Sequence, residues 1–483
     1  MTSILVIDVG TTSVRAAIVD EQLTITALAP RPFPPSSPSP GLVEFDATEL
    51  AALVLDAAGE VLAVTSEPVS GVGITNQRAT TIVWDRATGR PVGPALGWQD
   101  LRTVIECITA KDEHGLALAP NQTATKAAWL LDQVEGGRQR DLCIGTVDSW
   151  VVWTLTGGSC HVTDHTNAAV TGLLAADASG WNDRALDALG IPAAMLPTVV
   201  DSSGVLGSAT VLDGAPPIAA VVGDQQASLV GQGCVAPGRT KITFGTGGML
   251  DLCLGPDAPS SSQRSANGTF PIVAWSAGGG LMWGTEGIML SAGTNVDWLC
   301  DDLGLIATSE ESHEVASSVD TTDGAVFVPA LLGLGTPQWD YGARGTLLGV
   351  TRGTTRAHVV RAVLEGVAHR GADLVDAAEA DTGASIDVLR VDGGMSANPT
   401  FTQALADAAG RPVEVSPVVE ATTLGAAFLA GLATDVFGDI ADAEANWRPS
   451  RIAEPRTRLD RDLWQRAVER STGWIPELSA LDF

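Results

Sequence analysis

Apolar runs that end in small and hydroxylated residues recur along the chain. Residues 4–20, ILVIDVGTTSVRAAIVD, place two apolar stretches on either side of a Gly-Thr-Thr-Ser segment, which predicts a β-hairpin. Residues 239–255, RTKITFGTGGMLDLCLG, repeat this outline about half a chain later. A second hairpin of the same kind predicts that the chain is built from two similar halves.

Segments with helical spacing of apolar residues follow the predicted strands in both halves. The clearest of these segments are 43–64, 124–134, 356–380 and 421–433. Asp46 has the residue type and position of an N-cap for the first helix. This alternation favours an α/β fold of two lobes with a cleft between them. The boundary falls near Pro237, so we expect an N-terminal lobe at 1–236 and a C-terminal lobe at 237–483.

The balance of charges excludes some classes of partner. The 483-residue chain has 57 acidic and 28 basic side chains and a formal net charge of −29, which argues against binding to nucleic acid or to anionic membranes. We find no signal-peptide pattern and no run of about 18 apolar residues, so we expect a soluble, cytoplasmic protein. The six cysteines lack C-x-x-C spacing, which favours reduced thiols over a zinc site or disulfides.

The first turn has the composition of a phosphate-binding loop. A glycine turn lets backbone N–H groups approach phosphate oxygens, and the hydroxyls of Thr11, Thr12 and Ser13 add donors. Arg15 supplies positive charge, and Asp8 is an oxygen ligand of the kind that Mg²⁺ prefers. The alternative is a tight hairpin in which these residues only stabilise the turn.

Two further turns of this kind occur in the second half of the chain. The segment FGTGG, residues 244–248, forms the turn of the second predicted hairpin, and DGGMSAN, residues 392–398, lies between a predicted strand and a predicted helix. Three glycine turns of this kind in one chain make a purely structural role for them a poor explanation.

A carboxylate at the end of a third apolar strand indicates acid–base chemistry. The segment VVGDQQ, residues 221–226, places Asp224 where a strand gives way to a helix, followed by Gln225. A carboxylate in this position beside a cleft can act as a general base, and an amide can hold a polar substrate. The alternative for Asp224 is an N-cap of the next helix. Arg78 and Trp98 add a donor and an apolar wall suited to a small polyhydroxy molecule.

Taken together, these segments resemble the FGGY family of carbohydrate kinases and, within it, the glycerol kinases. The matching stretches extend from about residue 3 to the C-terminal LWQRAVERSTGW. They include DVGTTSVRA, GITNQRATTIVWDRATGRPV, WQDLRT, HVTDHTNAAVTGLL, GDQQASLVGQG, FGTGG, RVDGGMSAN and TTLGAAFLAGLA.

The resemblance implies two actin-like lobes of the ribonuclease-H type, with MgATP bound between them. It implies that Asp224 is the base that takes the proton of the acceptor hydroxyl, and that Asp8 is the carboxylate associated with Mg²⁺. The residues implied to contact ATP are Thr11, Thr12, Ser13, Arg15, Thr246, Gly247, Gly293, Gly394 and Asn398. The residues implied to contact the acceptor are Arg78, Trp98, Asn121, Asp224, Gln225 and Met249.

The acceptor pocket departs from the glycerol kinase pattern at three positions. Ala79 stands where glycerol kinases have a glutamate, Asn121 where they have a tyrosine, and Met249 where they have a phenylalanine. Losing a charged acceptor and two aromatic walls widens a pocket, and losing a partner for a hydroxyl reduces discrimination for it. The hypothesis is that the natural acceptor is a longer polyol or an open-chain sugar rather than glycerol.

The sequence therefore predicts an ATP-dependent kinase for glycerol or a related polyol. One alternative is a kinase for a longer polyol or a ketose, such as erythritol or xylulose. Another is a non-catalytic actin-like protein that only binds nucleotide, against which Asp224 argues. The expected ligands are ATP, Mg²⁺ and a small polyol or sugar. Because members of the family are often dimers or tetramers, a homo-oligomer is also an expectation.

Overall fold

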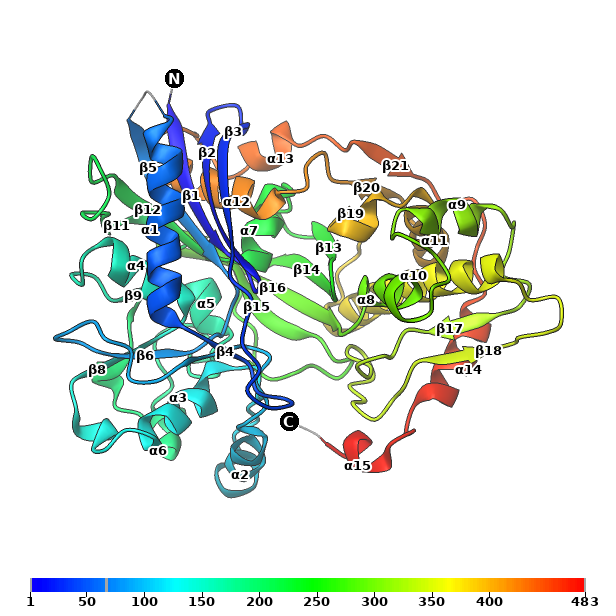
Figure 1. The fold of residues 1–483 in the computed structure, drawn as a ribbon, viewed down its shortest axis with the longest axis horizontal. Helices are drawn as coiled ribbons and strands as arrows, with labels where there is room; N and C mark the ends of the chain where they lie inside the picture. The colour runs from blue at the N-terminus through cyan, green and yellow to red at the C-terminus, as the bar shows by residue number, and fades with distance from the viewer. Residues whose placement is uncertain (1, 66–67, 482–483) are drawn as a thin grey trace.

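The fold is α/β, as the sequence predicts. The computed structural model describes residues 2–65 and 68–481. In it the N-terminal half of the chain lies beside the C-terminal half, and one mixed sheet extends through both (Figure 1). Within the described residues this sheet has 13 strands, in the order β21-β20-β19-β13-β14-β16-β15-β11-β12-β5-β1-β2-β3. The two halves of the sheet meet at β11 and β15, where Ser203 pairs with Ala277.

The strands of the sheet fall into two groups along the chain. Those of the N-terminal half are β1 Ser3–Val9, β2 Ser13–Asp20, β3 Ile25–Pro32, β5 Val69–Asn76, β11 Ser203–Ser208 and β12 Pro217–Gly223. Those of the C-terminal half are β13 Thr240–Phe244, β14 Gly248–Gly255, β15 Phe270–Ala277, β16 Gly280–Met289, β19 Leu389–Asp392, β20 Val413–Val415 and β21 Arg451–Ala453. Short two-stranded pairs are β4 Glu44–Phe45 with β7 Ala95–Leu96, β6 Ile82–Asp85 with β8 Leu142–Gly145, β9 Val162–Asp164 with β10 Thr198–Val200, and β17 Val326–Val328 with β18 Thr346–Leu348.

The helices follow the strands in both halves. The N-terminal half contains α1 Ala47–Ala63, α2 Val104–His114, α3 Thr123–Asp132, α4 Val147–Leu155, α5 His165–Ala169, α6 Asp183–Leu189 and α7 Asp224–Gly231. The C-terminal half contains α8 Thr294–Asp297, α9 Glu311–Ser317, α10 Arg356–Thr382, α11 Pro399–Ala409, α12 Ala421–Ala433, α13 Asp442–Asn446, α14 Arg461–Ser471 and α15 Pro476–Ser479. Asp46 caps α1 as predicted, because its side chain accepts hydrogen bonds from the backbone of Thr48 and Glu49.

The two halves repeat one strand arrangement. In the first, β1 and β2 form an antiparallel hairpin, β5 lies parallel to β1, and β12 lies parallel to β5. In the second, β13 and β14 form the hairpin, β19 lies parallel to β13, and β20 lies parallel to β19. The similarity predicted from the two glycine hairpins is therefore present in the topology.

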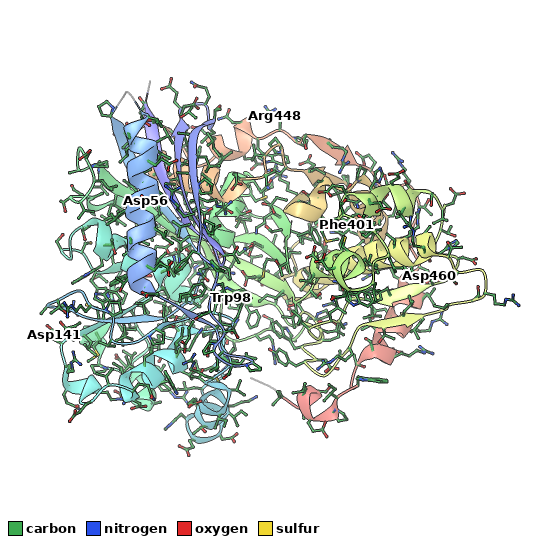
Figure 2. All side chains as sticks on the ribbon, in the orientation of Figure 1. Asp56, Trp98, Asp141, Phe401, Arg448 and Asp460 are labelled. Atoms are coloured by element: carbon green, nitrogen blue, oxygen red, sulfur yellow. The ribbon has the colours of Figure 1, made fainter. Side chains whose placement is uncertain are left out.

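Each half has its own apolar core. Leu50 and Val54 of α1 pack with Leu5 and Ile7 of β1 in the N-terminal core. Ile242 of β13 and residues of the long helix α10 belong to the C-terminal core. In Figure 2, Asp56 of α1 lies in the left part of the view and Phe401 of α11 to the right of the middle, one in each half.

Helix α12 connects the two halves. It lies late in the chain, yet Leu424 and Phe428 pack with Ile4 and Val6 of β1. It also crosses α7 at backbone contact, since a β-carbon on Gly425 would collide with the carbonyl of Ala227. That the two lobes divide at residue 236 stays a prediction. On that division, α12 belongs to the C-terminal lobe but covers strands of the N-terminal lobe. Among the described helices, none has the length and apolar character that a membrane span requires.

Candidate active site

The first glycine turn joins β1 to β2 and is held by its neighbours. The backbone N–H of Gly10 donates to the carbonyl of Ser13 at 2.9 Å, and the side-chain amide of Gln77, at the end of β5, donates to the carbonyl of Gly10 at 3.2 Å. Thr12 is exposed, and Thr11 and Ser13 are half-buried. The backbone of the turn is thus fixed by hydrogen bonds while its hydroxyls remain accessible, as a phosphate loop requires.

Asp8 and Arg15 lie opposite each other at the base of this turn. They are cross-strand partners, and the Arg15 guanidinium lies 2.9 Å from the Asp8 carboxylate. Arg15 also reaches Glu420, just before α12, at 2.5 Å. Burial raises the pKa of Asp8 to about 6, against the attraction of Arg15, and the charges of Asp224 and Glu420 add to the rise. Two carboxylates predicted to take part in the reaction therefore lie close enough to interact.

The second turn is docked on the segment that contains Gly293. The N–H of Gly293 donates to the carbonyl of Gly245, and that of Ala292 to the carbonyl of Thr246, both at 2.8 Å. A β-carbon on Gly293 would lie 2.6 Å from the carbonyl oxygen of Gly245, so the approach requires glycine. Thr246 is exposed and Gly247 is half-buried. The structure thus brings together three of the residues predicted to bind ATP.

The third turn follows β19 and lies beside the second. A β-carbon on Gly393 would collide with the backbone of Phe244, the last residue of β13. Gly394 begins a short 3-10 helix, and Asn398 is the N-cap of α11, where its side chain accepts from the N–H of Phe401 at 3.1 Å. The Asn398 amide also donates to Ser312 of α9 at 2.9 Å. All predicted ATP contacts of the C-terminal half therefore lie on connected segments.

Asp224 is the first residue of α7 and is not its N-cap, which is Gly223. Its carboxylate accepts a hydrogen bond from the N–H of Gln225 at 2.8 Å, and its side chain is 29% exposed. Burial raises the pKa of Asp224, while Arg78 and this hydrogen bond oppose the rise. A carboxylate that is partly accessible and has a raised pKa suits a general base. Because Gly223 occupies the N-cap position of α7, the alternative in which Asp224 is the N-cap is wrong.

The turn before Asp224 is fixed by residues to which the sequence assigned no role. The hydroxyl of Thr166, on α5, accepts from the N–H of Gly223 at 2.8 Å. Asp164 caps α5 and accepts from the Thr166 hydroxyl at 2.9 Å. These residues lie in the segment HVTDHTNAAVTGLL. Its run of Asp, Thr and Asn next to a strand is the sequence feature that could have indicated their role.

Arg78 connects the candidate base to the other half of the chain. Its Nε lies 3.6 Å from Asp224, and its Nη2 lies 2.6 Å from Glu286 on β16. Its Nη1 is buried and has no hydrogen-bond partner within the described part of the chain. Burial raises the pKa of Glu286 to about 7; Arg78 opposes this rise, and Asp251 adds to it. The sequence predicted Arg78 but missed Glu286.

Gln225 is held from the C-terminal half by Lys241. The Lys241 ammonium donates to the side-chain carbonyl of Gln225 and to the hydroxyl of Thr243, both at 2.8 Å. It also forms an ion pair with Asp251 on β14 at 2.8 Å. Met249 lies two residues before Asp251 and is paired with Thr243 across the hairpin, so it shares their face of the sheet.

Trp98 links the predicted acceptor wall to the first phosphate turn. Its indole N–H donates to the hydroxyl of Thr11 at 3.3 Å, and its backbone N–H donates to the hydroxyl of Thr80 at 3.2 Å. Trp98, labelled in Figure 2, lies near the middle of the view. A single side chain thus contacts residues of both predicted subsites.

Lys126 of α3 holds the backbone next to Trp98. Its ammonium donates to the carbonyl of Gly97, next to Trp98, at 2.8 Å and to that of Asn121 at 3.5 Å. The side chain is fully buried, and burial lowers the pKa of Lys126 to about 7. Asn121 itself is exposed. The sequence gave no role to Lys126, although a lone lysine in an apolar helix was a signal.

Ala79 is buried and has a positive φ of 62°. Its carbonyl accepts a hydrogen bond from the hydroxyl of Thr123 at 3.3 Å. A non-glycine residue in the left-handed region is uncommon and often lies at a functional site. Ala79 therefore has a constrained backbone beside Arg78, at the position where the glycerol kinase pattern has a glutamate.

The Asp8 carboxylate alone is too few ligands for Mg²⁺, so the nucleotide would have to supply further oxygens. The Oδ2 of Asp8 is buried and has no hydrogen bond within the described residues, with Arg15 as its ionic neighbour. Residues 2–65 and 68–481 contain no cluster of three or more His, Cys, Asp or Glu side chains that could hold a metal. Mg²⁺ is commonly bound by one or two carboxylates together with nucleotide phosphates and water, so Asp8 fits that kind of site.

The comparisons with known proteins agree with this fold. Residues 3–231 match the N-terminal domain of the FGGY family of carbohydrate kinases, and residues 240–434 match its C-terminal domain. A chain that matches both domains is a carbohydrate kinase, an ATP-dependent phosphotransferase. This chain belongs to the FGGY family of carbohydrate kinases, as its motifs predicted.

Individual relatives are similar over nearly the whole chain. A glycerol kinase of Aromatoleum aromaticum is 43% identical over 498 residues, which cover 98% of this chain and 100% of that protein. The crystal structure of Plasmodium falciparum glycerol kinase with ADP has a TM-score of 0.90 at 30% identity and covers 98% of each chain. A xylulose kinase from Lactobacillus acidophilus has a TM-score of 0.86 at 20% identity, with 100% of this chain and 99% of that one covered, which shows the shared fold.

Proposed function

We propose that the protein transfers the γ-phosphoryl group of ATP to a hydroxyl of glycerol or a closely related polyol, with Asp224 as the general base. The observation that carries this proposal is the position of Asp224. It begins α7 beside Arg78, retains partial exposure, and interacts with the charge of Asp8 below the first glycine turn. Relatives about 42% identical over almost the full length, which are glycerol kinases, support the choice of acceptor.

In the proposed reaction the acceptor hydroxyl donates a hydrogen bond to Asp224 and attacks the γ-phosphorus of ATP. The new bond joins the acceptor oxygen to phosphorus, the bond from phosphorus to the β–γ bridging oxygen breaks, and ADP leaves. The hydroxyl proton passes to Asp224. Phosphoryl transfer depends mainly on positioning and charge stabilisation, and Arg78 and the glycine turns supply donors for both.

The phosphates of ATP would lie against the first and second turns. The hydroxyls of Thr11, Thr12 and Ser13, with Arg15, face the phosphates from one half, and Thr246 with Gly247 from the other. Gly293, Gly394 and Asn398 would line the rest of the nucleotide site. When bound, Mg²⁺ would neutralise phosphate charge, with Asp8 and the phosphates as its ligands. The six cysteines are free, and ATP is the substrate, which together support a cytoplasmic location.

A longer polyol or a ketose is the second candidate acceptor. Ala79, Asn121 and Met249 support it, because together they remove a charge and two rings from the pocket relative to glycerol kinases. The exposure of Asn121 leaves that side of the pocket open to a longer molecule. A homo-oligomer stays a prediction.

The test is ADP release by the purified protein with MgATP and a panel of glycerol, erythritol, ribitol and xylulose. We expect glycerol or one longer acceptor to stimulate turnover. The Asp224→Asn variant should lower kcat by about 10²–10⁴-fold while binding ADP with unchanged affinity. Failure of every acceptor to stimulate turnover, or full activity in Asp224→Asn, would overturn the proposal.

A further inference from the structure

A row of charged side chains crosses three neighbouring strands of the C-terminal half. Lys241 on β13 is the cross-strand partner of Asp251 on β14, and Asp251 is the partner of Glu286 on β16. All three side chains are buried, Lys241 and Asp251 completely. Directly paired side chains on adjacent strands lie on the same face, so the row forms one continuous polar strip in an apolar sheet.

This strip faces two residues of the other half. Lys241 reaches Gln225, and Glu286 reaches Arg78, at 2.8 and 2.6 Å respectively. Gln225 and Arg78 are both predicted to contact the acceptor. The Asp224 carboxylate neighbours both, since it lies 3.6 Å from Arg78 Nε and accepts a hydrogen bond from the backbone N–H of Gln225. The strip therefore contacts two predicted acceptor residues from the C-terminal half.

Lys241 itself is fully buried and already engaged with three neighbouring side chains. A lysine ammonium has three N–H donors, and here they face Gln225, Thr243 and Asp251. Because an ammonium can only donate, the Gln225 atom that faces it must be the amide carbonyl oxygen. The end of Gln225 left for another partner is its NH₂ group, which is a donor.

The charges in this region fit that arrangement. Among the described residues, the strip together with Arg78 and Asp224 contains two cations, Arg78 and Lys241, and three carboxylates, Asp224, Asp251 and Glu286. With Glu286 protonated, the group is neutral. Burial and Asp251 both raise the pKa of Glu286, which favours the protonated form of Glu286.

We propose that Lys241 and Asp251 are positioning residues for the acceptor. They fix Gln225 so that it presents its NH₂ group, and not its carbonyl, to an oxygen of the bound polyol. With the unpartnered Nη1 of Arg78, this gives the site two donor side chains beside a single accepting carboxylate, Asp224. Such a site holds the non-reacting oxygens of the acceptor through their lone pairs. This inference rests on the proposed polyol kinase function.

The first experiment is a double-mutant cycle between Gln225 and the Lys241–Asp251 pair. Lys241→Met and Asp251→Leu are made together, because removing one member alone would leave a buried charge unpaired. With glycerol as acceptor, or erythritol where glycerol gives no turnover, we expect the pair replacement to raise the acceptor KM about tenfold. The KM for MgATP should stay within about twofold, and Gln225→Leu should raise the acceptor KM to a similar extent.

The combination of all three substitutions decides whether Lys241 acts through Gln225. If it does, the triple variant has the acceptor KM of Gln225→Leu alone. Effects that multiply, or a pair replacement that raises the KM values of acceptor and MgATP together, would show a merely structural role and overturn the inference.

A second variant avoids any change in the buried strip. Gln225→Glu gives Lys241 a charged partner but leaves an accepting oxygen where the NH₂ group had been. We expect the acceptor KM to rise more than about tenfold, with no loss of thermal stability. An unchanged KM would overturn the inference even if the pair replacement does not fold. No acceptor-dependent turnover in the unmutated protein would instead overturn the proposed function.

Discussion

The guanidinium of Arg78 lies 2.6 Å from the carboxylate of Glu286 and joins the two halves of the chain beside the candidate base. Arg78 follows β5 in the N-terminal half, whereas Glu286 lies in β16 of the C-terminal half. A movement of the halves that separates these two residues would break this contact. The pair thus links the geometry of the acceptor site to the relative position of the halves.

The first prediction concerns the stability of the protein as a function of pH. Burial raises the pKa of Glu286 from its ordinary value of 4.5 to about 7. Between these values the folded chain keeps a proton that the unfolded chain has lost, so the free energy of unfolding decreases as the pH rises through that range. Glu286→Gln cannot titrate and should make this decrease smaller, leaving the part contributed by Asp8, whose pKa is also raised. Thermal unfolding at about pH 5 and pH 8 would measure the difference.

Glu49→Gln is the matched control for this measurement, because Glu49 is exposed on α1. It should unfold with the same pH dependence as the unmutated protein. An equal loss of stability between the two pH values in Glu286→Gln and in the control would contradict the raised pKa of Glu286.

The second prediction concerns the indole of Trp98. Trp98→Phe keeps an apolar ring in the acceptor wall but removes the hydrogen bond to the Thr11 hydroxyl. Because Thr11 belongs to the predicted phosphate turn, we expect the KM for MgATP to rise about three- to tenfold, with less change in the acceptor KM. Trp181→Phe removes a comparable bond, to the carbonyl of Pro197, and should change neither value. An equal change in the KM for MgATP in the two variants would show that the hydrogen bond from Trp98 to Thr11 does not affect ATP binding.

The third prediction concerns acceptor choice at position 79. Ala79→Glu restores the carboxylate that glycerol kinases have beside the pocket arginine. If the missing charge widens the range of acceptors, this variant should raise kcat/KM for glycerol relative to erythritol by about tenfold. Ala79→Gly is the control for backbone effects, since glycine adopts the φ of 62° without strain and adds no charge. A shift of equal size in the glycine variant would point to the backbone instead.

The fourth prediction concerns Lys126. Lys126→Met retains the length of the side chain but removes its hydrogen bonds to the carbonyls of Gly97 and Asn121. These carbonyls flank the acceptor wall, so we expect the acceptor KM to rise about fivefold while ADP affinity is unchanged. Parallel titrations of acceptor kinetics and ADP binding would measure this, and a weaker affinity for ADP would show that the whole site had shifted.

The parts of the fold that depend on local pattern were predictable from the sequence. The two glycine hairpins, the cap at Asp46 and the strand–turn–helix at Asp224 each follow from residues close together in the chain. The three glycine turns suggested a phosphate site for the same reason. Their meeting at one place depended on how the halves pack, and the sequence supplied this only through its family resemblance.

The charged strip shows what sequence pattern alone does not settle. Lys241 and Asp251 could be paired once the turn of their hairpin was known, because the register follows from the turn. Glu286 comes 35 residues after Asp251 and joins them only through the order of strands in the sheet. The contact of Arg15 with Glu420 spans 405 residues. Pairings of this kind are tertiary and leave no periodic signal.

Helix α12 has a consequence for how the protein is made. The ribosome completes β1 first, but Leu424 and Phe428, which cover Ile4 and Val6, are among the last parts of the core to be synthesised. Until then the emerging N-terminal half presents an uncovered apolar sheet face of the kind that aggregates or recruits chaperones. A nascent chain stopped near residue 236 should therefore stay associated with chaperones, whereas a chain extended beyond α12, which ends at Ala433, should be released.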